Sequence, residues 1–253
     1  MNLQGKKGLV VGIANEHSIA TGCAQAFANA GAELVVTYLN DKSKSYVEPV
    51  ATVLGAAMLL PLDVQDDQQL DAVFERIASQ WGGLDFLLHA VAYCPKDDLH
   101  GRVTDCSRAG FAEAMDISCH SFIRMARKAE PLMKNGGSLL TLSYYGAEKV
   151  VNHYNIMGPV KAALESSVRY LAADLGPSGI RVNGISPGPL QTRAASGIAH
   201  FDELINQARQ RAPKRHLVSI EDVGNMATFL VSDAATSVTG DISFVDAGYH
   251  VMA

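Results

Sequence analysis

GLVVGIANEHSIATG, residues 8–22, joins an apolar run to a glycine turn and the start of a helix. Gly12 permits a sharp turn after a strand, and Ser18 stands where the N-cap of the helix is expected. Free backbone N–H groups at a helix N-terminus bind phosphate, so the amides of Ser18 and Ile19 are candidates for holding a pyrophosphate. Because the turn and the helix start hold only two glycines, Gly12 and Gly22, an ordinary strand–loop–helix corner remains the alternative.

The rest of the chain repeats this alternation of apolar runs and helical patterns. Apolar runs predict strands at 8–12, 33–38, 58–62, 84–91, 138–143, 181–185 and 242–245. Helical patterns cover 18–29, 67–80, 111–133, 154–175 and 222–231. Strands that are apolar throughout and separated by helices predict an α/β fold, a Rossmann-type doubly wound parallel sheet. No linker divides 1–253, so we expect a single domain, with a substrate-binding loop and helix at about 188–213.

The composition argues against several classes of protein. The 253 residues carry a formal charge of −5, so no basic excess is present for binding nucleic acid. The four cysteines are widely spaced and form no CxxC pair, which predicts neither a metal site nor disulfides and fits a reducing cytoplasm. The N-terminus leads directly into the first strand, which argues against a signal peptide, and no apolar run is long enough to span a membrane.

Tyr154 and Lys161 form the strongest chemical signal in the sequence. They are seven residues apart, so two turns of one helix would place both side chains on the same face. A neighbouring ammonium favours the ionised phenol and strengthens its hydrogen bonding to developing negative charge. A surface helix with a solvated lysine is the alternative. The position of the pair, after the fifth strand of a doubly wound sheet, favours the catalytic interpretation.

Two polar residues near strand ends have both a binding and a structural interpretation. Asp63 can accept a hydrogen bond from the amino group of an adenine, with Val64 packing on the ring, or it can begin a helix. We interpret His89 as a buried, hydrogen-bonded core residue. The small side chains that follow it, through Val91, would let the backbone approach a ribose or a nicotinamide.

Five segments in order carry a resemblance to a known family. They are Gly12-x5-Ser18-Ile-Ala-x-Gly22, the triplet LDV at 62–64, LTLSY at 140–144 with the tyrosine–lysine segment 154–161, the strand and turn 181–189, and the loop 192–197. Over nearly its full length the chain resembles the short-chain dehydrogenases/reductases. Within that superfamily it resembles the bacterial NADH-dependent enoyl-[acyl-carrier-protein] reductases of fatty acid synthesis.

The resemblance implies NADH-dependent reduction of the trans-2 double bond of enoyl thioesters. Hydride would reach the β-carbon, Tyr154 would stabilise the enolate, and Lys161 would hold the nicotinamide ribose. Tyr144 matches the family's second active-site tyrosine, or else forms an aromatic wall of the acyl pocket. Cys94 is expected to be a pocket wall against the substrate. The implied cofactor contacts are Gly12, Ser18, Ile19, Leu39, Asp63, Val64, Val91, Lys161, Leu190, Thr192, Arg193 and Ala194.

The chain departs from the ordinary carbonyl reductases in one place. It departs from the enoyl reductase pattern at Leu39, at residues 200–203, and at Arg193, which stands where an apolar residue is common. Ordinary carbonyl reductases carry an asparagine where this chain reads 116–118 as DIS, which suits reduction of a C=C bond. Leu39 replaces a polar residue, and no arginine stands there to pair with a 2′-phosphate, so NADH is expected rather than NADPH. Acidic residues occupy 202–203, where basic ones commonly serve an acidic carrier. Basic residues that could bind the carrier instead come later, at Arg209, Arg211, Lys214 and Arg215, although these could equally be a solvated helix end. The sequence therefore leaves open whether the acyl carrier is acyl carrier protein or coenzyme A.

Two other functions remain open from the sequence. A carbonyl reductase or 3-hydroxyacyl dehydrogenase would share the fold, and a non-catalytic nucleotide sensor would not require Tyr154 and Lys161. Superfamily members are often homotetramers, and residues 239–253 resemble their subunit-contacting tail. The apolar side chains of Ile198 and Phe201 either line an acyl channel or pack in the core.

Overall fold

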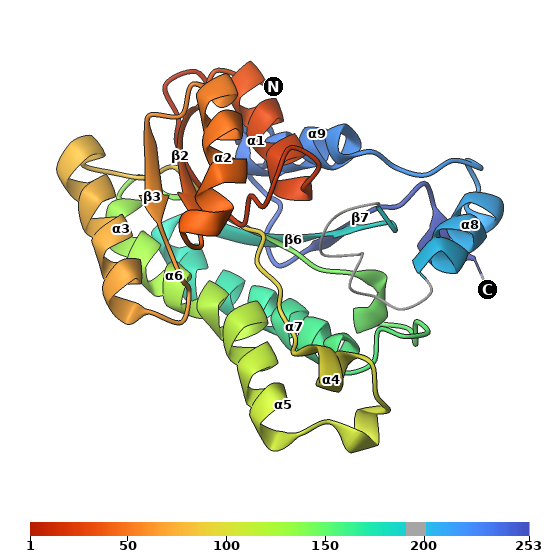
Figure 1. Ribbon diagram of the computed structural model, residues 1–253. Helices are drawn as coiled ribbons and strands as arrows, with labels where there is room; N and C mark the ends of the chain where they lie inside the picture. The colour runs from red at the N-terminus through yellow and green to blue at the C-terminus, as the bar shows by residue number, and fades with distance from the viewer. Residues whose placement is uncertain (191–200, 253) are drawn as a thin grey trace.

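The computed structural model describes residues 1–190 and 201–252, in which seven strands form one parallel sheet in the order β3-β2-β1-β4-β5-β6-β7 (Figure 1). The strands are β1 (Lys7–Val11), β2 (Glu33–Tyr38), β3 (Met58–Pro61), β4 (Phe86–His89), β5 (Gly137–Leu142), β6 (Ile180–Pro187) and β7 (Ile242–Val245). The helices are α1 (Ile19–Asn29), α2 (Asp41–Leu54), α3 (Asp67–Trp81), α4 (Lys96–Leu99), α5 (Arg108–Met115), α6 (Ser121–Ala129), α7 (Met157–Leu175), α8 (Phe201–Arg211) and α9 (Ile220–Val231). The predicted doubly wound parallel sheet is confirmed.

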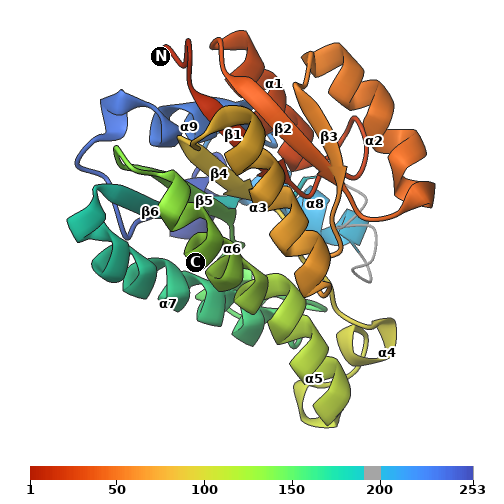
Figure 2. The ribbon, with the colours of Figure 1, turned by 90° about the vertical axis from the view of Figure 1, so that its left-hand side faces the viewer.

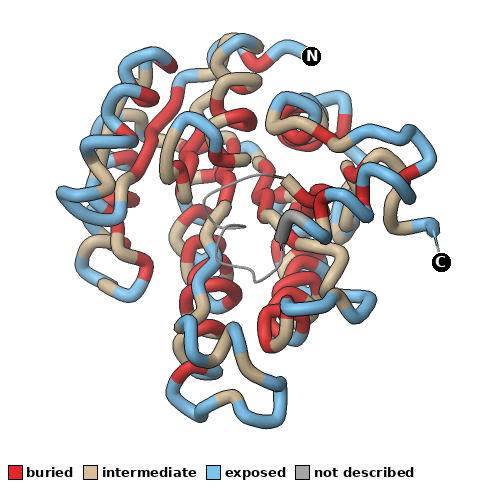
Figure 3. The backbone as a smooth tube through the Cα atoms, turned by 45° about the vertical axis from the view of Figure 1, so that its right-hand side comes forward, coloured by how far each residue is buried: buried red, intermediate tan, exposed pale blue. Residues whose placement is uncertain are grey.

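Helices cover both faces of the sheet, with α1, α2 and α9 on one face and α3, α6 and α7 on the other (Figures 1 and 2). Successive residues of a strand point to opposite faces. Leu9 and Leu87 therefore join the core under α3, α6 and α7, whereas Val10 and Leu88 join the core under α1, α2 and α9. Figure 3 shows the buried residues concentrated along the sheet and on the inner sides of the helices. Two buried faces explain why the strands read as apolar throughout.

Three segments differ from the expectations. Helix α2 was not predicted, because Pro49 interrupts its pattern; a capping box between Asn40 and Ser43 begins it. The helix expected over 111–133 is two α-helices, α5 and α6, joined by a π-helical turn, Asp116–His120. Of the substrate-binding segment expected at 188–213, residues 191–200 lie outside the described residues, and α8 occupies much of the remainder. No helix in the described part of the chain is long and apolar enough to cross a membrane.

Helix α1 approaches α9 closely at Gly22. A Cβ atom at Gly22 would lie 2.3 Å from the backbone oxygen of Ile220, and one at Gly224 would lie 2.4 Å from the backbone oxygen of Gly22. Gly22 and Gly224 therefore let the two helices pack together.

Replacing Gly22 with alanine should lower the free energy of unfolding by about 1–3 kcal/mol, because the added methyl meets backbone rather than a movable side chain. Gly101→Ala is the matched control, since Gly101 lies in a loop and a Cβ atom there would make only an ordinary contact, 3.5 Å from the backbone oxygen of Asp97. Urea denaturation of the two variants gives the comparison. Equal stability of the two would show that the α1–α9 approach tolerates a side chain.

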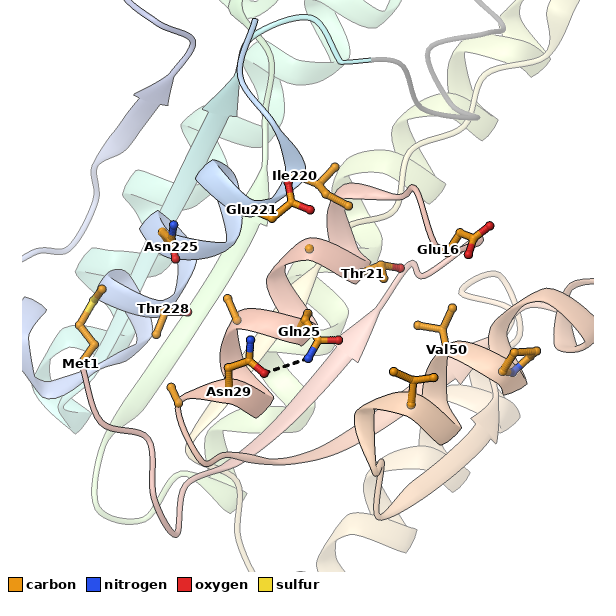
Figure 4. Close-up of a pocket in the computed structure, with 15 residues that line it drawn as sticks. Met1, Glu16, Thr21, Gln25, Asn29, Val50, Ile220, Glu221, Asn225 and Thr228 are labelled. Carbon is orange, nitrogen blue, oxygen red and sulfur yellow. Dashed lines mark hydrogen bonds between the residues drawn. The ribbon is translucent and has the colours of Figure 1, made fainter.

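The same helices border a groove of about 670 Å³ between α1, α2 and α9 (Figure 4). Polar and apolar side chains both line it, and Gln25 Nε2 donates a hydrogen bond to Asn29 Oδ1 at 2.9 Å. Among the described residues, none of those predicted for the functional site lines this groove.

Candidate active site

A cavity of about 420 Å³ lies at the carboxyl ends of β1, β4, β5 and β6, where the strand order reverses. This is the edge at which a doubly wound sheet binds its ligands. It brings together predicted site residues that are far apart in the sequence: Gly12, Ser18, Ile19, Val91, Cys94, Tyr144, Tyr154, Lys161 and Leu190. Leu39, Asp63 and Val64 do not line this cavity, and Thr192, Arg193 and Ala194 lie outside the described residues.

The turn after β1 differs in detail from the expected phosphate cradle. Gly12 has φ +111°, and a Cβ atom there would lie 2.2 Å from the backbone oxygen of Ala90, so a glycine is needed. Ser18 is the N-cap residue, but its hydroxyl donates to the backbone oxygen of Asn15 at 2.8 Å and does not cap the helix. The amide of Ser18 donates to the same oxygen at 3.2 Å. Within the first turn of α1, the amides of Ile19 and Ala20 have no acceptor among the described residues. The sequence predicted the amides of Ser18 and Ile19 instead.

Tyr154 lies in a turn before α7, not on the helix that carries Lys161. His153 and Asn155 have φ of 64° and 44°, the left-handed region, which a right-handed helix cannot include. The Asn155 side chain donates to the backbone oxygen of Leu99 at 2.6 Å and ties this turn to α4. The predicted common helical face is therefore wrong, although both side chains still line the same cavity.

Tyr144 and Tyr154 pack edge to face, with ring centroids 4.8 Å apart. Burial raises the pKa of both phenols well above the ordinary value, and each ring's neighbours add to the effect. For Tyr154 this is opposite to the ionised phenol that the nearby lysine was expected to favour. The hydroxyl of Tyr144 is buried and has no hydrogen-bond partner among the described residues. Both groups are thus neutral donors, which suits stabilising a developing oxyanion.

Lys161 is buried on α7, and its Nζ donates to the backbone oxygen of Leu142 at 2.7 Å. Burial lowers its pKa to about 8, while Cys119 and Glu165 oppose that shift. An ammonium has three N–H donors, so two remain for a ligand or water after the bond to Leu142.

Comparison with known proteins agrees with this geometry. The family described as enoyl-(acyl carrier protein) reductase matches residues 12–250. The chain belongs to this family. The enoyl-[acyl-carrier-protein] reductase [NADH] 1 of Rhizobium meliloti (strain 1021) is 52% identical over 250 residues, which cover 99% of this chain and 92% of that protein. The resemblance inferred from the five sequence segments is confirmed.

Two solved structures of enoyl reductases have nearly the same fold. The enzyme of Anaplasma phagocytophilum in complex with NAD has a TM-score of 0.96 and 50% identity, over 99% of this chain and 95% of that one. The enzyme of Bacillus cereus with NADP+ and indole naphthyridinone has a TM-score of 0.97 and 44% identity, over 100% of each chain. Both agree with the single-domain fold described above.

His89 is the core residue that the sequence suggested, at the edge of this enoyl reductase cavity. Its Nδ1 lies 3.0 Å from Thr141 Oγ1 and its Nε2 lies 2.8 Å from Ser121 Oγ. Burial, together with the charge of Lys161, lowers its pKa to about 3. The ring is therefore neutral and takes no part as a proton donor at ordinary pH.

The three predicted residues at the other end of the site lie after β2 and β3. Leu39 is 53% exposed, so it presents an apolar side chain to solvent beside the strand end. The Asp63 carboxylate accepts from the amide of Gln65 at 3.0 Å, and Asp66, not Asp63, caps α3. Val64 is buried in the core. The helix-initiating alternative for Asp63 is thus excluded, and its contact with an adenine stays a prediction.

Two residues that position the site were missed from the sequence. Ser118 Oγ accepts from the amide of Tyr93 at 2.9 Å and donates to its carbonyl oxygen at 3.0 Å, which fixes the segment after β4. The DIS triplet at the family's asparagine position was the available signal. Glu165 receives a hydrogen bond from the hydroxyl of Ser143 at 2.5 Å. A glutamate one helical turn after Lys161 has no distinctive pattern in a single sequence.

Proposed function

We propose that this protein reduces the trans-2 double bond of enoyl thioesters with NADH, as an enoyl-[acyl-carrier-protein] reductase. The observation that carries the proposal is the convergence of two protonated phenols, Tyr144 and Tyr154, and the ammonium of Lys161 on one cavity. Membership of the enoyl reductase family, with curated relatives that are NADH-dependent by name, supports the substrate and the cofactor.

The chemistry of the cavity fits a nicotinamide dinucleotide. The free amides of Ile19 and Ala20 suit a pyrophosphate oxygen, and the free N–H donors of Lys161 suit ribose hydroxyls. The unpartnered hydroxyl of Tyr144 is a donor that a bound ligand would satisfy. Leu39 offers no partner for a 2′-phosphate, which supports NADH, although the Bacillus cereus relative was solved with NADP+.

The residues of this chain act mainly on the thioester carbonyl. Bound NADH supplies the hydride that adds to the β-carbon of the substrate. As the C=C electrons move onto the carbonyl oxygen, Tyr154 donates a hydrogen bond to the forming enolate, and Tyr144 is close enough to assist. Lys161 keeps positive potential nearby and orients the ribose. Proton addition to the α-carbon, from Tyr154 or from water, completes the reduction.

The rate should fall on the alkaline side because of Lys161. Since burial lowers its pKa to about 8, Lys161 is charged below that pH and neutral above it. Ionisation of Tyr154 does not contribute to this decline in rate, because the pKa of its phenol is raised far above the ordinary value. We expect kcat/KM, which reports the free enzyme, to decline above about pH 8 when measured at constant ionic strength. A profile that stays level to about pH 10 would exclude Lys161 as the titrating group.

The carrier and the assembly are part of the same proposal. Arg209, Arg211, Lys214 and Arg215 are exposed at the end of α8 and in the turn after it, where they suit an acidic acyl carrier protein. The resemblance to the superfamily supports a homotetramer, and four free cysteines fit the reducing cytoplasm.

Loss of NADH absorbance with crotonyl thioesters of acyl carrier protein and of coenzyme A tests the proposal, with NADPH as the second cofactor. Oxidation of NADH with either crotonyl thioester supports enoyl reduction, and the ratio of the two rates identifies the preferred carrier. Turnover of β-ketoacyl but not of crotonyl thioesters would identify a carbonyl reductase. NADH binding without turnover of any thioester would identify a nucleotide sensor.

A further inference from the structure

A carboxyl group is buried beside the active-site lysine. Glu165 is 5% exposed and stands four residues after Lys161 on α7, which places the two side chains on adjacent turns of one helix face. A buried carboxylate without a partner is strongly unfavourable, so its presence here requires groups that stabilise the charge. Neither the cavity lining nor the catalytic steps described above use Glu165.

Ser143 holds this carboxyl in place. Its hydroxyl donates to Glu165 Oε1 at 2.5 Å, and its amide donates to the backbone oxygen of Ile185 on β6 at 2.7 Å. Ser143 directly follows Leu142, whose carbonyl oxygen accepts from Lys161. The end of β5 thus contacts both the ammonium of Lys161 and the carboxyl of Glu165, and it fixes the two groups relative to each other.

We propose that Glu165 is a positioning residue that keeps Lys161 protonated inside the buried site, with Ser143 holding the carboxylate toward it. The proposal rests on the function proposed above. Its physical basis is that burial removes water from the ammonium and favours the neutral amine, whereas a fixed negative charge on the next helical turn favours the ammonium.

Other ionisable groups face this pair from neighbouring elements. Around Lys161, His89 on β4 is neutral, whereas Cys119 in the π-helical turn acts in the same direction as Glu165. Burial raises the pKa of Glu165 above its ordinary value, and Glu148 adds to that shift. The hydrogen bond from Ser143 and the charges of Arg169 and Lys161 oppose the shift and favour the carboxylate. Cys119 is therefore the competing explanation for the charge of Lys161, and the test must separate it from Glu165.

Glu165→Gln is the central variant, because glutamine keeps the shape and can still accept from Ser143 but carries no charge. We expect the alkaline midpoint of kcat/KM to move down by about one pH unit. NADH binding, followed by cofactor fluorescence without substrate, should show the same downward shift of its midpoint. Glu165→Asp, which restores the charge, should return both midpoints toward those of the unchanged protein. Cys119→Ala measures the competing contribution, and it should move both midpoints less than Glu165→Gln does.

Ser143→Ala is the second variant and decides the matter if Glu165→Gln does not fold. It keeps the carboxylate but releases it from its hydrogen bond, so we expect a smaller downward shift, of about half a pH unit. Unchanged midpoints in both variants, or a shift in Cys119→Ala alone, would overturn the proposal. A general loss of rate at every pH without a moved midpoint would also overturn it, because that is the signature of a structural defect.

The measurement of NADH binding without substrate distinguishes failure of this inference from failure of the proposed function. If the unchanged protein binds NADH but reduces no thioester, the proposed function fails, while the pH dependence of NADH binding still tests Glu165. If the unchanged protein turns over crotonyl thioesters and Glu165→Gln leaves both midpoints in place, the inference alone fails.

Discussion

Replacement of Tyr154 with phenylalanine is expected to lower kcat by about one to three orders of magnitude. The phenol is buried, its pKa is raised, and its ring is held edge to face against Tyr144, so it is a fixed neutral donor. Removing such a donor withdraws stabilisation from the enolate but leaves the shape of the cavity. The measurement is kcat with NADH and a crotonyl thioester at saturation.

Tyr145→Phe is the matched control for that variant. Tyr145 is the neighbour of Tyr144, but it contacts Phe244 and Tyr249 and does not line the cavity. Loss of the Tyr145 hydroxyl should therefore change kcat little. An unchanged kcat for Tyr154→Phe, or an equal loss for the two variants, would remove Tyr154 from the mechanism.

Replacement of Lys161 with alanine is expected to weaken NADH binding by about tenfold or more and to lower kcat as well. In the proposed mechanism the side chain supplies both the ribose donors and a positive charge near the reacting carbonyl, so two separate quantities should change. NADH affinity is measured by cofactor fluorescence, and turnover by NADH consumption. Lys149→Ala, at an exposed lysine in the loop after β5, is the control and should retain both.

Unaltered NADH affinity in Lys161→Ala, with turnover lost, would separate the two roles. In that case the lysine would act on the carbonyl through its charge, and the ribose contact would belong to other residues.

Much of the fold could be predicted from the sequence because the sheet is buried on both faces. Runs such as GLVV at 8–11 carry no polar residue, so the strands and their parallel direction follow from the pattern. Helix α2 could not be predicted in the same way, since Pro49 and many charged residues hide its narrow apolar face. The α1–α9 contact at Gly22 was also hidden, because it depends on which helices become neighbours.

The sequence predicted which residues form the site better than it predicted how they are arranged. Tyr154 and Lys161 meet in one cavity, but a left-handed turn at His153 and Asn155 places the tyrosine outside the helix, and a spacing of seven residues cannot reveal that. The direction of the Tyr154 pKa shift depends on burial, which outweighs the nearby ammonium. The hydrogen bond from Ser143 to Glu165 joins two elements that only the folded sheet brings together.

The most direct test of the central claim is the position of the transferred hydrogen. The protein would be supplied with a crotonyl thioester and NADH that carries deuterium at both C4 positions, and the product would be analysed by mass spectrometry. This account predicts a butyryl thioester with one deuterium on the β-carbon. Unreacted crotonyl thioester under conditions where NADH binds, or a butyryl thioester without deuterium on the β-carbon, would contradict it.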